Sequence, residues 1–202
     1  MTRENPPPGT RERLVAAMLE ALRTRGYHGV GLADVLAAAG APKGVLYHHF
    51  PGGKSELAVS AIDAVVGQIG VELDKVFQRT GDPVQALGVW LGGAQRSLET
   101  SGFERGCPLA TIALESSPDD GAIRRALAQG FAAIRSRLVG VLVGSGLSEA
   151  RSRSLAALIV SAYEGALLQA RVAGNVQPMR DTADALIGLI QLNLDERPPA
   201  RP

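Results

Sequence analysis

The sequence predicts an all-α protein with an N-terminal three-helix domain of the helix-turn-helix type and a larger C-terminal helical domain. Apolar residues recur at helical spacing from residue 11 onward, and glycines and prolines stand where helices would end and restart. No segment alternates polar and apolar residues as a convincing strand does. The chain has 202 residues, of which 46% are hydrophobic, so it can bury a sizeable core.

The first predicted helix runs from Arg11 to Arg25 and ends at Gly26, where a C-terminal cap belongs. Its apolar positions recur at helical spacing and predict one buried face, formed by Leu14, Val15, Met18, Leu19 and Leu22.

Two short helices are expected next, one from about Leu32 to Ala39 and one from about Pro42 to His49. Gly40 permits the tight turn between them, and Pro51 begins the break that follows. This arrangement is a helix-turn-helix, and four of its apolar residues should be buried against the first helix: Val35, Leu36, Leu46 and Phe50.

The rest of the chain is predicted to be helical with one irregular stretch. Gly102–Ser116 is expected to hold a loop and a short helix near Leu109–Leu114, and a further helix should start near Ser117, which has a capping-box spacing to Asp120. The other predicted helices are Ser55–Arg79, Pro83–Thr100, Ser148–Gly174 and Pro178–Asp195.

The expected domain boundaries follow from this pattern. Residues 10–54 form the helix-turn-helix domain and residues 55–196 the C-terminal domain. Residues 1–9 and 197–202 are rich in proline and poor in apolar surface, so we expect both tails to be disordered.

Composition narrows the class of protein. No continuous apolar segment predicts a membrane span or a signal peptide, and the single cysteine cannot form an internal disulfide, so we expect a cytoplasmic protein with no membrane partner. Up to Lys54 the chain has seven Lys and Arg against four Asp and Glu (+3), whereas the remainder has fourteen against sixteen (−2). The N-terminal quarter is therefore the better candidate for contact with a polyanion.

The segment from Lys43 to His49 carries residues suited to DNA. A recognition helix presents its N-terminal side chains to the major groove, while neighbouring residues hold phosphates. Lys43 and Val45 can contact base edges, and Gly44 allows close backbone approach. The remaining polar residues around this helix can bind phosphate: Tyr47, His48, His49 and Lys54.

These residues resemble the TetR family of bacterial regulators. The resemblance rests on Thr10-Arg-Glu-Arg, Gly26-Tyr, Leu32-Ala-Asp-Val-Leu, Ala39-Gly, Lys43-Gly-Val-Leu-Tyr-His-His-Phe50 and Lys54-Ser-Glu-Leu57. It implies an all-helical homodimer that represses by binding a palindromic double-stranded DNA operator and is released by a small molecule. It also implies that Lys43, Gly44 and Val45 read bases, that Tyr47, His48 and Lys54 hold phosphates, and that the backbone at Gly31 and Leu32 touches a phosphate.

Two features depart from the commoner family pattern. Gly31 and Pro42 stand where a Ser or Thr cap is usual, and the Pro51-Gly-Gly-Lys54 turn has an additional residue. This turn, with Gly106-Cys-Pro-Leu and Ala113-Leu-Glu-Ser116, resembles the branch that includes repressors of lincomycin-type multidrug resistance genes.

The C-terminal domain is expected to bind the effector, apolar or aromatic, and to form the dimer. Small residues at Ala162, Gly165, Ala166 and Ala170 would allow close helix approach, and the resemblance implies dimerisation through residues 148–196. Five residues are candidates for the ligand site, although each could equally be plain core: Trp90, Phe103, Cys107, Phe131 and Tyr163.

The residues leave two other functions open. Adjacent His48 and His49 lack the spacing of a shared metal-ligand pair, and the sequence predicts no metal, cofactor or catalytic residue. The alternatives are a DNA-binding protein without a ligand, and a small helical enzyme that uses Cys107 or the pair Glu115 and Glu164.

Overall fold

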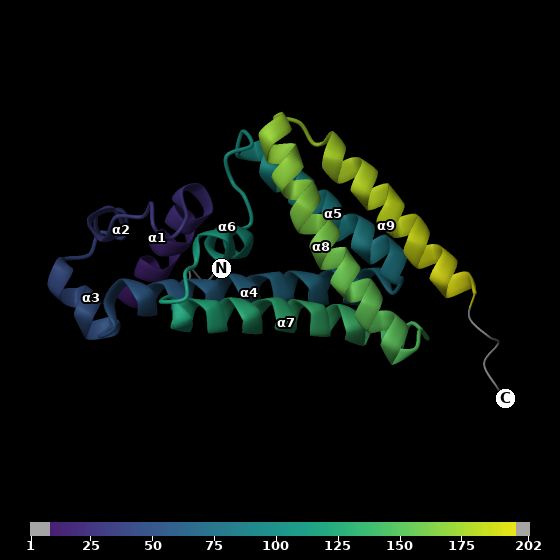
Figure 1. Ribbon diagram of the computed structural model, residues 1–202, viewed down its shortest axis with the longest axis horizontal. Helices are drawn as coiled ribbons and strands as arrows, with labels where there is room; N and C mark the ends of the chain where they lie inside the picture. Colours follow the sequence, from purple (N-terminus) through teal and green to yellow (C-terminus); the bar gives the residue numbers. More distant parts are fainter. Residues whose placement is uncertain (1–8, 197–202) are drawn as a thin grey trace, which may run out of the picture. The chain divides into compact units, whose positions relative to one another are not determined.

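The computed structural model describes residues 9–196 and is helical throughout that range, with no strand (Figure 1). The two predicted disordered tails fall outside the described residues, except for Gly9. In chain order the helices are α1 (Thr10–Arg25), α2 (Leu32–Ala38), α3 (Lys43–His49), α4 (Gly53–Thr80), α5 (Pro83–Thr100), α6 (Pro108–Glu115), α7 (Gly121–Gly144), α8 (Glu149–Ala173) and α9 (Gln177–Asp195).

Apart from the start of α7, the helices begin and end near the glycine, proline and capping residues that predicted them. Asp82 accepts a hydrogen bond from the Val84 amide (2.9 Å) at the start of α5, and Ser148 accepts one from the Arg151 amide (3.3 Å) at the start of α8. Gly174 ends α8 in the left-handed conformation, with φ of 64°.

The start of α7 differs from the prediction. The helix begins at Gly121 rather than near Ser117, because the Asp120 carboxylate accepts hydrogen bonds from the Ser117 amide (2.8 Å) and hydroxyl (2.9 Å). The capping-box spacing thus builds a tight turn before the helix, and the first helical bond runs from Arg124 to the Asp120 carbonyl.

The chain forms two compact units. One holds the described residues up to Val65 together with Pro108–Ala128, and the other holds Val66–Cys107 together with the described residues from Gln129 onward. Helix α6 therefore packs with the N-terminal helices, although it lies far from them in sequence.

The first unit has its core between α1, α2 and α3. The four helix-turn-helix residues predicted to be buried are all buried, as is the apolar face of α1. The Arg13 side chain of α1 donates a hydrogen bond to the Ala39 carbonyl (3.0 Å) and so satisfies the C-terminal end of α2.

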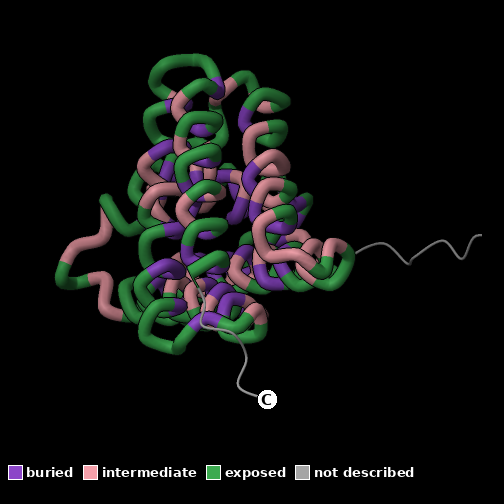
Figure 2. Tube along the Cα trace, turned by 90° about the vertical axis from the view of Figure 1, so that its right-hand side faces the viewer, coloured by how far each residue is buried: buried purple, intermediate pink, exposed green. Residues whose placement is uncertain are grey.

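In the second unit α5 and α8 both pack against α9, and α4 lies beside α7 (Figure 1). A Cβ added at Gly130 of α7 would lie 2.7 Å from the Val66 side chain, so the glycine permits close approach of α4. Arg137 of α7 and Asp74 of α4 form an exposed ion pair. Figure 2 shows buried and exposed residues interleaved along the helices, as helices with one packed face require.

Helices α7 and α8 are each long and apolar enough, by length and composition, to cross a membrane. Core helices of water-soluble proteins meet the same two criteria, and both helices include several arginines, among them Arg135 and Arg153.

Candidate DNA-binding site and effector region

The turn between α2 and α3 depends on one glycine. Gly40 has φ of 58°, a left-handed conformation that strongly favours glycine, and the Ala41 amide then donates a hydrogen bond to the Leu36 carbonyl (3.0 Å). The turn sets the direction in which α3 leaves α2.

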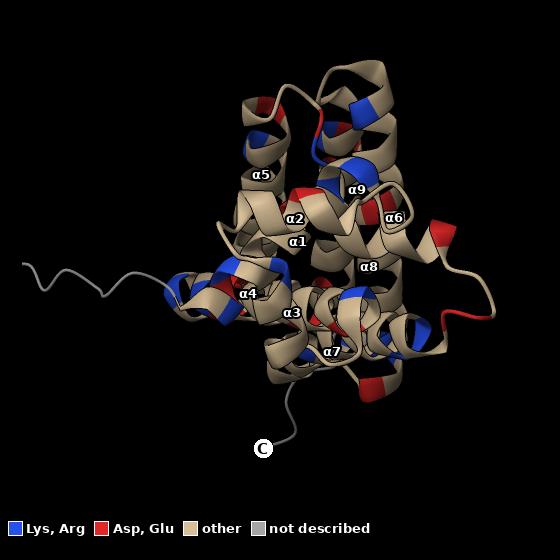
Figure 3. Cartoon of the chain, turned by 90° about the vertical axis from the view of Figure 1, so that its left-hand side faces the viewer, with Lys and Arg blue, Asp and Glu red and all other residues tan. Residues whose placement is uncertain are grey.

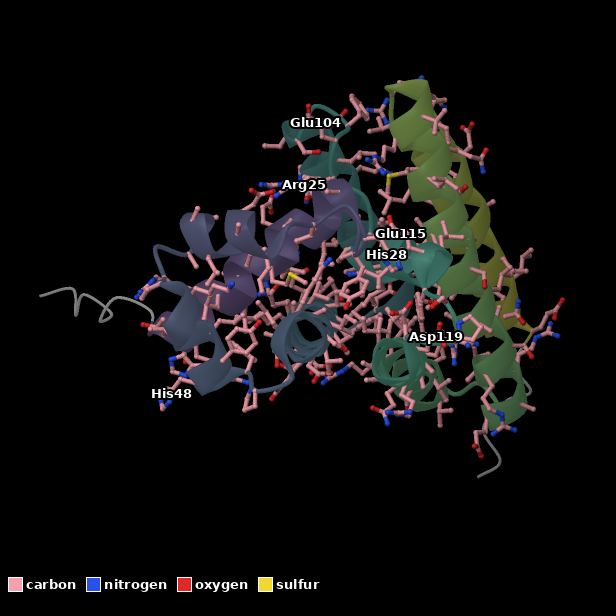
Figure 4. All side chains as sticks on the ribbon, turned by 60° about the vertical axis from the view of Figure 1, so that its left-hand side comes forward. Arg25, His28, His48, Glu104, Glu115 and Asp119 are labelled. Carbon is pink, nitrogen blue, oxygen red and sulfur yellow. The ribbon has the colours of Figure 1, made fainter. Side chains whose placement is uncertain are left out.

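Helix α3 presents the predicted DNA-contacting residues on one exposed side. Lys43, Gly44, Tyr47 and His48 are exposed, whereas Leu46 on the opposite side is fully buried. Nothing lies within 4 Å of the position that a Cβ at Gly44 would occupy, so the backbone there is open to a partner. Figure 4 shows His48 projecting from the outer side of α3.

Two other predicted residues of α3 are only half-buried. Val45 is partly covered, and the His49 ring lies edge-on between His48 (5.1 Å between centroids) and Phe50 (6.4 Å). His49 is thus held by aromatic packing on both sides, and His48 is the more accessible of the two histidines.

The additional residue before Lys54 has a defined structural role. Gly53 adopts φ of 66° and its amide bonds the Phe50 carbonyl (2.8 Å), while the Glu56 carboxylate accepts a hydrogen bond from the Gly52 amide (2.7 Å). A Cβ at Gly53 would lie 3.5 Å from the Tyr47 ring. The turn therefore begins α4 with a capped end and lies directly beside Tyr47.

Lys54 is engaged within the first unit. Its ammonium lies 4.5 Å from the centroid of the Tyr27 ring. Burial lowers the pKa of Lys54, and the charge of Glu115 acts in the opposite direction. A DNA phosphate would compete with these two partners for the ammonium.

The N-terminus of α2 contains the other two predicted residues. Gly31 is exposed and makes no side-chain cap, and Leu32 is half-buried. Asp34 in the first turn pairs with Arg25 of α1 (2.9 Å), which holds a negative charge close to these amides. Figure 3 shows the distribution of charged residues over these helices.

Glu115, the last residue of α6, contacts the turn between α1 and α2. Its carboxylate accepts a hydrogen bond from the His28 amide (3.1 Å), and a Cβ added at Gly26 would overlap this carboxylate. Gly26 also has φ of 67°, so its backbone conformation favours glycine, and a side chain there would have to displace the Glu115 carboxylate. Figure 4 shows Glu115 and His28 side by side.

The segment after α6 adds a second contact to the same turn. Asp120 lies 3.7 Å from Nε2 of His28, an ion pair when the histidine is protonated. Hydrogen bonds from Ser117 hold the pKa of Asp120 below its usual value, and His28 acts in the same direction. The Tyr27 hydroxyl in turn hydrogen-bonds Ser55 at the start of α4. The α1–α2 turn is thus connected to α4, α6 and the α6–α7 segment.

The structure brings together two of the five predicted ligand-site residues as a ring pair in the second unit. The rings of Trp90 on α5 and Tyr163 on α8 lie 4.9 Å apart with an interplanar angle of 37°. Cys107 is buried and hydrogen-bonds the Glu164 carboxyl, which follows Tyr163 in sequence. Phe103 and Phe131 are half-buried, and Phe103 has a left-handed φ of 66°.

Sequence reasoning assigned no regulatory or ligand-binding role to Glu115, Glu164 or Glu56. The sequence feature that could have revealed Glu164 as an inward-facing residue is its helical register. It lies four residues after Val160 and three before Leu167, both of which are buried. The contact of Glu115 with His28 joins residues 87 positions apart, so no local pattern could have shown it.

Among residues 9–196, no three His, Cys, Asp or Glu side chains lie together as a metal site requires.

Comparison with known proteins bears on both parts of the chain. Residues 14–61 match the bacterial regulatory proteins of the tetR family, and residues 83–185 match the C-terminal domain of LmrA/YxaF-like transcriptional regulators. The HTH-type transcriptional regulator Rv0196 of Mycobacterium tuberculosis is 30% identical over 94% of this chain and 98% of its own length. LmrA of Bacillus subtilis is 26% identical over 90% of this chain and 97% of its own length.

Solved structures show the same fold. The regulatory protein TetR from Rhodobacter sphaeroides superposes with a TM-score of 0.78 at 27% identity, covering 89% of this chain and 97% of that protein. A TetR transcriptional regulator from Legionella pneumophila has a TM-score of 0.78 at 22% identity, covering 93% and 98%.

These relatives are transcriptional regulators, so the alternative of a small helical enzyme is excluded. The resemblance in the helix-turn-helix segment and the narrower resemblance in the C-terminal domain are both confirmed. The chain belongs to the TetR family of DNA-binding transcriptional regulators and has an LmrA/YxaF-like C-terminal domain.

Proposed function

We propose that this regulator is a repressor that binds a palindromic operator as a homodimer and leaves it when a small apolar or aromatic molecule binds the C-terminal domain. The observation that carries the proposal is the exposed side of α3, on which Lys43, Gly44 and Tyr47 are open to solvent above a buried Leu46. Exposed basic and aromatic residues on so short a helix suit a DNA groove.

The residues of this unit divide between bases and phosphates. Lys43, Gly44 and Val45 approach base edges, because they form the N-terminal turn of α3. Tyr47 and His48 donate to phosphates, and His49 supports them from its packed position. Lys54 and the backbone at Gly31 and Leu32 complete the phosphate contacts, with Lys54 leaving the Tyr27 ring to do so.

A homodimer through α8 and α9 is supported by exposed apolar surface. Leu168 and Val172 of α8 are 54% and 82% exposed, and Leu192 of α9 is 61% exposed. A shallow, mostly apolar groove also runs between the two helices, lined by Leu158, Ala162, Asp181, Thr182, Ala185, Leu186 and Leu189. Ala166 and Ala170 are buried within the chain, so of the four small residues only Ala162 and Gly165 remain available to a partner helix.

Helix α6 is the proposed route of the effector signal. It begins immediately after Cys107 in the chain and ends at Glu115, which holds the α1–α2 turn through the His28 amide. An effector that displaces Cys107 would therefore move Glu115 and alter the presentation of α3, which shifts the population away from the operator-binding form. We place the protein in the cytoplasm, where regulators of this family typically act.

The test is DNA binding by purified protein, measured by fluorescence anisotropy on the DNA upstream of its own gene and neighbouring genes. Tyr47→Ala should weaken binding to all sequences, because a phosphate contact is lost. Lys43→Ala should weaken binding and reduce discrimination between specific and random DNA, since a base contact is lost.

Lys75→Ala is the matched control, because Lys75 is also exposed but lies on α4 in the second unit. Operator affinity that is unchanged by both Tyr47→Ala and Lys43→Ala would exclude α3 as the recognition helix. The rival DNA-binding protein without an effector would show neither a thermal shift with apolar compounds nor release of operator DNA.

A further inference from the structure

Glu164 is a carboxylic acid on the inward side of an apolar helix. It lies in register with buried Val160 and Leu167 on α8, and its Oε2 atom is buried without a hydrogen-bond partner among the described residues. Its carboxyl is hydrogen-bonded by the Cys107 side chain, which is a weak donor. Burial raises the pKa of Glu164, and the bond from Cys107 opposes this effect.

This arrangement lowers the stability of the folded protein when no ligand is bound. A buried carboxylate oxygen without a donor costs free energy, and an apolar residue of similar size would avoid that cost. A ligand that supplies the missing donor, and a positive charge with it, would be bound strongly for the same reason.

A pair of aromatic rings on α5 and α8 suits the rest of such a ligand. Tyr163 precedes Glu164 on α8, and its ring pairs with Trp90 of α5 at 4.9 Å. Both rings are half-buried, so part of their surface is open to another group. Aromatic faces attract flat apolar molecules and also organic cations.

We propose that Glu164 is the polar anchor of the effector site and selects aromatic molecules that carry a protonated amine. The ammonium group donates to Oε2 of Glu164, while the ring packs against Trp90 and Tyr163. This inference rests on the proposed function, since it names the class of effector for the same C-terminal domain.

The experiment compares ligands that differ only in charge. The probes are 4-phenylbenzylamine and 4-phenylbenzyl alcohol, together with the smaller pair benzylamine and benzyl alcohol, at a pH where both amines are protonated. Affinities for the full-length protein are measured by calorimetry. Quenching of Trp90, the single tryptophan of the chain, places the ligand at the ring pair.

The wild-type protein should prefer the amine over the alcohol by at least about tenfold in one or both pairs, as a charge-assisted hydrogen bond implies. Glu164→Gln should abolish this preference while leaving alcohol binding within about threefold, because the volume of the side chain is kept. Glu72→Gln removes an equal charge from an exposed position of α4 and should leave the preference unchanged.

A wild-type protein that shows no amine preference in either pair would overturn the inference, as would a preference that survives Glu164→Gln. Operator release by the alcohols without any amine preference would refute the anchor and leave the proposed function standing. Amine binding that depends on Glu164 without any release of DNA would support Glu164 as the anchor and refute the proposed regulation.

Discussion

Burial disfavours the charged form of Glu164, whereas the hydrogen bond from Cys107 favours it. Burial has the larger effect on the pKa of Glu164. Its pKa is therefore higher in the folded protein than in the unfolded chain. The folded protein takes up a proton more readily at this site, so stability from the neutral form is present at low pH and is lost as pH rises through the folded pKa.

Replacing Glu164 by Gln should therefore stabilise the protein more at high pH than at low pH. We expect the gain in melting temperature over wild type to be larger at about pH 8 than at about pH 5, because only the wild-type carboxyl becomes charged inside the fold. Thermal denaturation of both proteins at the two pH values measures this. Glu72→Gln is the control, and an equal gain at both pH values for Glu164→Gln would contradict the assignment.

Individual residues also show where sequence reasoning succeeds. The helix-turn-helix pattern predicted that Leu46 and Phe50 are buried, and the structure confirms this. Lys43 was predicted to contact DNA because it begins the recognition helix, and its side chain is exposed there. The engagement of Lys54 with Tyr27 was not predicted, because the two residues are brought together only when the α1–α2 turn packs against the start of α4.

At the level of elements, the turn between α3 and α4 depends on the second of two glycines. Gly53 has φ of 66°, whereas Gly52 is not among the glycines with positive φ and donates its amide to Glu56. A residue with a Cβ at position 53 would occupy a left-handed conformation at a cost of about 1 kcal/mol.

Gly53→Ala should therefore lower the free energy of unfolding by about 1 kcal/mol, which chemical denaturation measures. Gly67→Ala is the matched control, because Gly67 is an exposed glycine inside α4 with nothing within 4 Å of its Cβ position. That substitution should stabilise the protein by about 0.5–1 kcal/mol, since alanine favours helix. Equal effects of the two changes would show that the turn does not constrain position 53.

Helix boundaries were predictable where a proline or glycine interrupts the pattern, as at Pro83 and Gly174. The predicted start of α7 was wrong because the hydrogen bonds between Ser117 and Asp120 form a turn before the helix. The same spacing of residues can also cap a helix at its first turn. The packing of α6 on α1 could not be predicted, since helical periodicity gives the buried face of a helix and not its partner.

At the scale of the whole molecule, α8 and α9 expose apolar side chains that a partner chain would bury. Val172 is 82% exposed and Leu168 is 54% exposed on one side of α8. A second copy of the chain would cover the same surface on both protomers by two-fold symmetry. Such a dimer would also fix the distance between two α3 helices, on which binding to two operator half-sites depends.

Val172→Glu should convert the proposed dimer to a monomer, because two charges would be buried in the symmetric interface. Light scattering after size exclusion measures the mass, and operator affinity should fall together with it. Val71→Glu is the control, since Val71 is 49% exposed but lies on α4. A Val172→Glu protein that remains dimeric would place the interface elsewhere.

The close contact between Gly26 and Glu115 also restricts which residues can occupy these two positions together. A side chain at position 26 cannot coexist with the carboxylate of residue 115 in its present place, and the left-handed backbone there adds a second restriction. Mutations at the two positions are therefore not independent. A larger residue at position 26 would displace the carboxylate of Glu115, and with it the hydrogen bond that links α6 to the His28 amide.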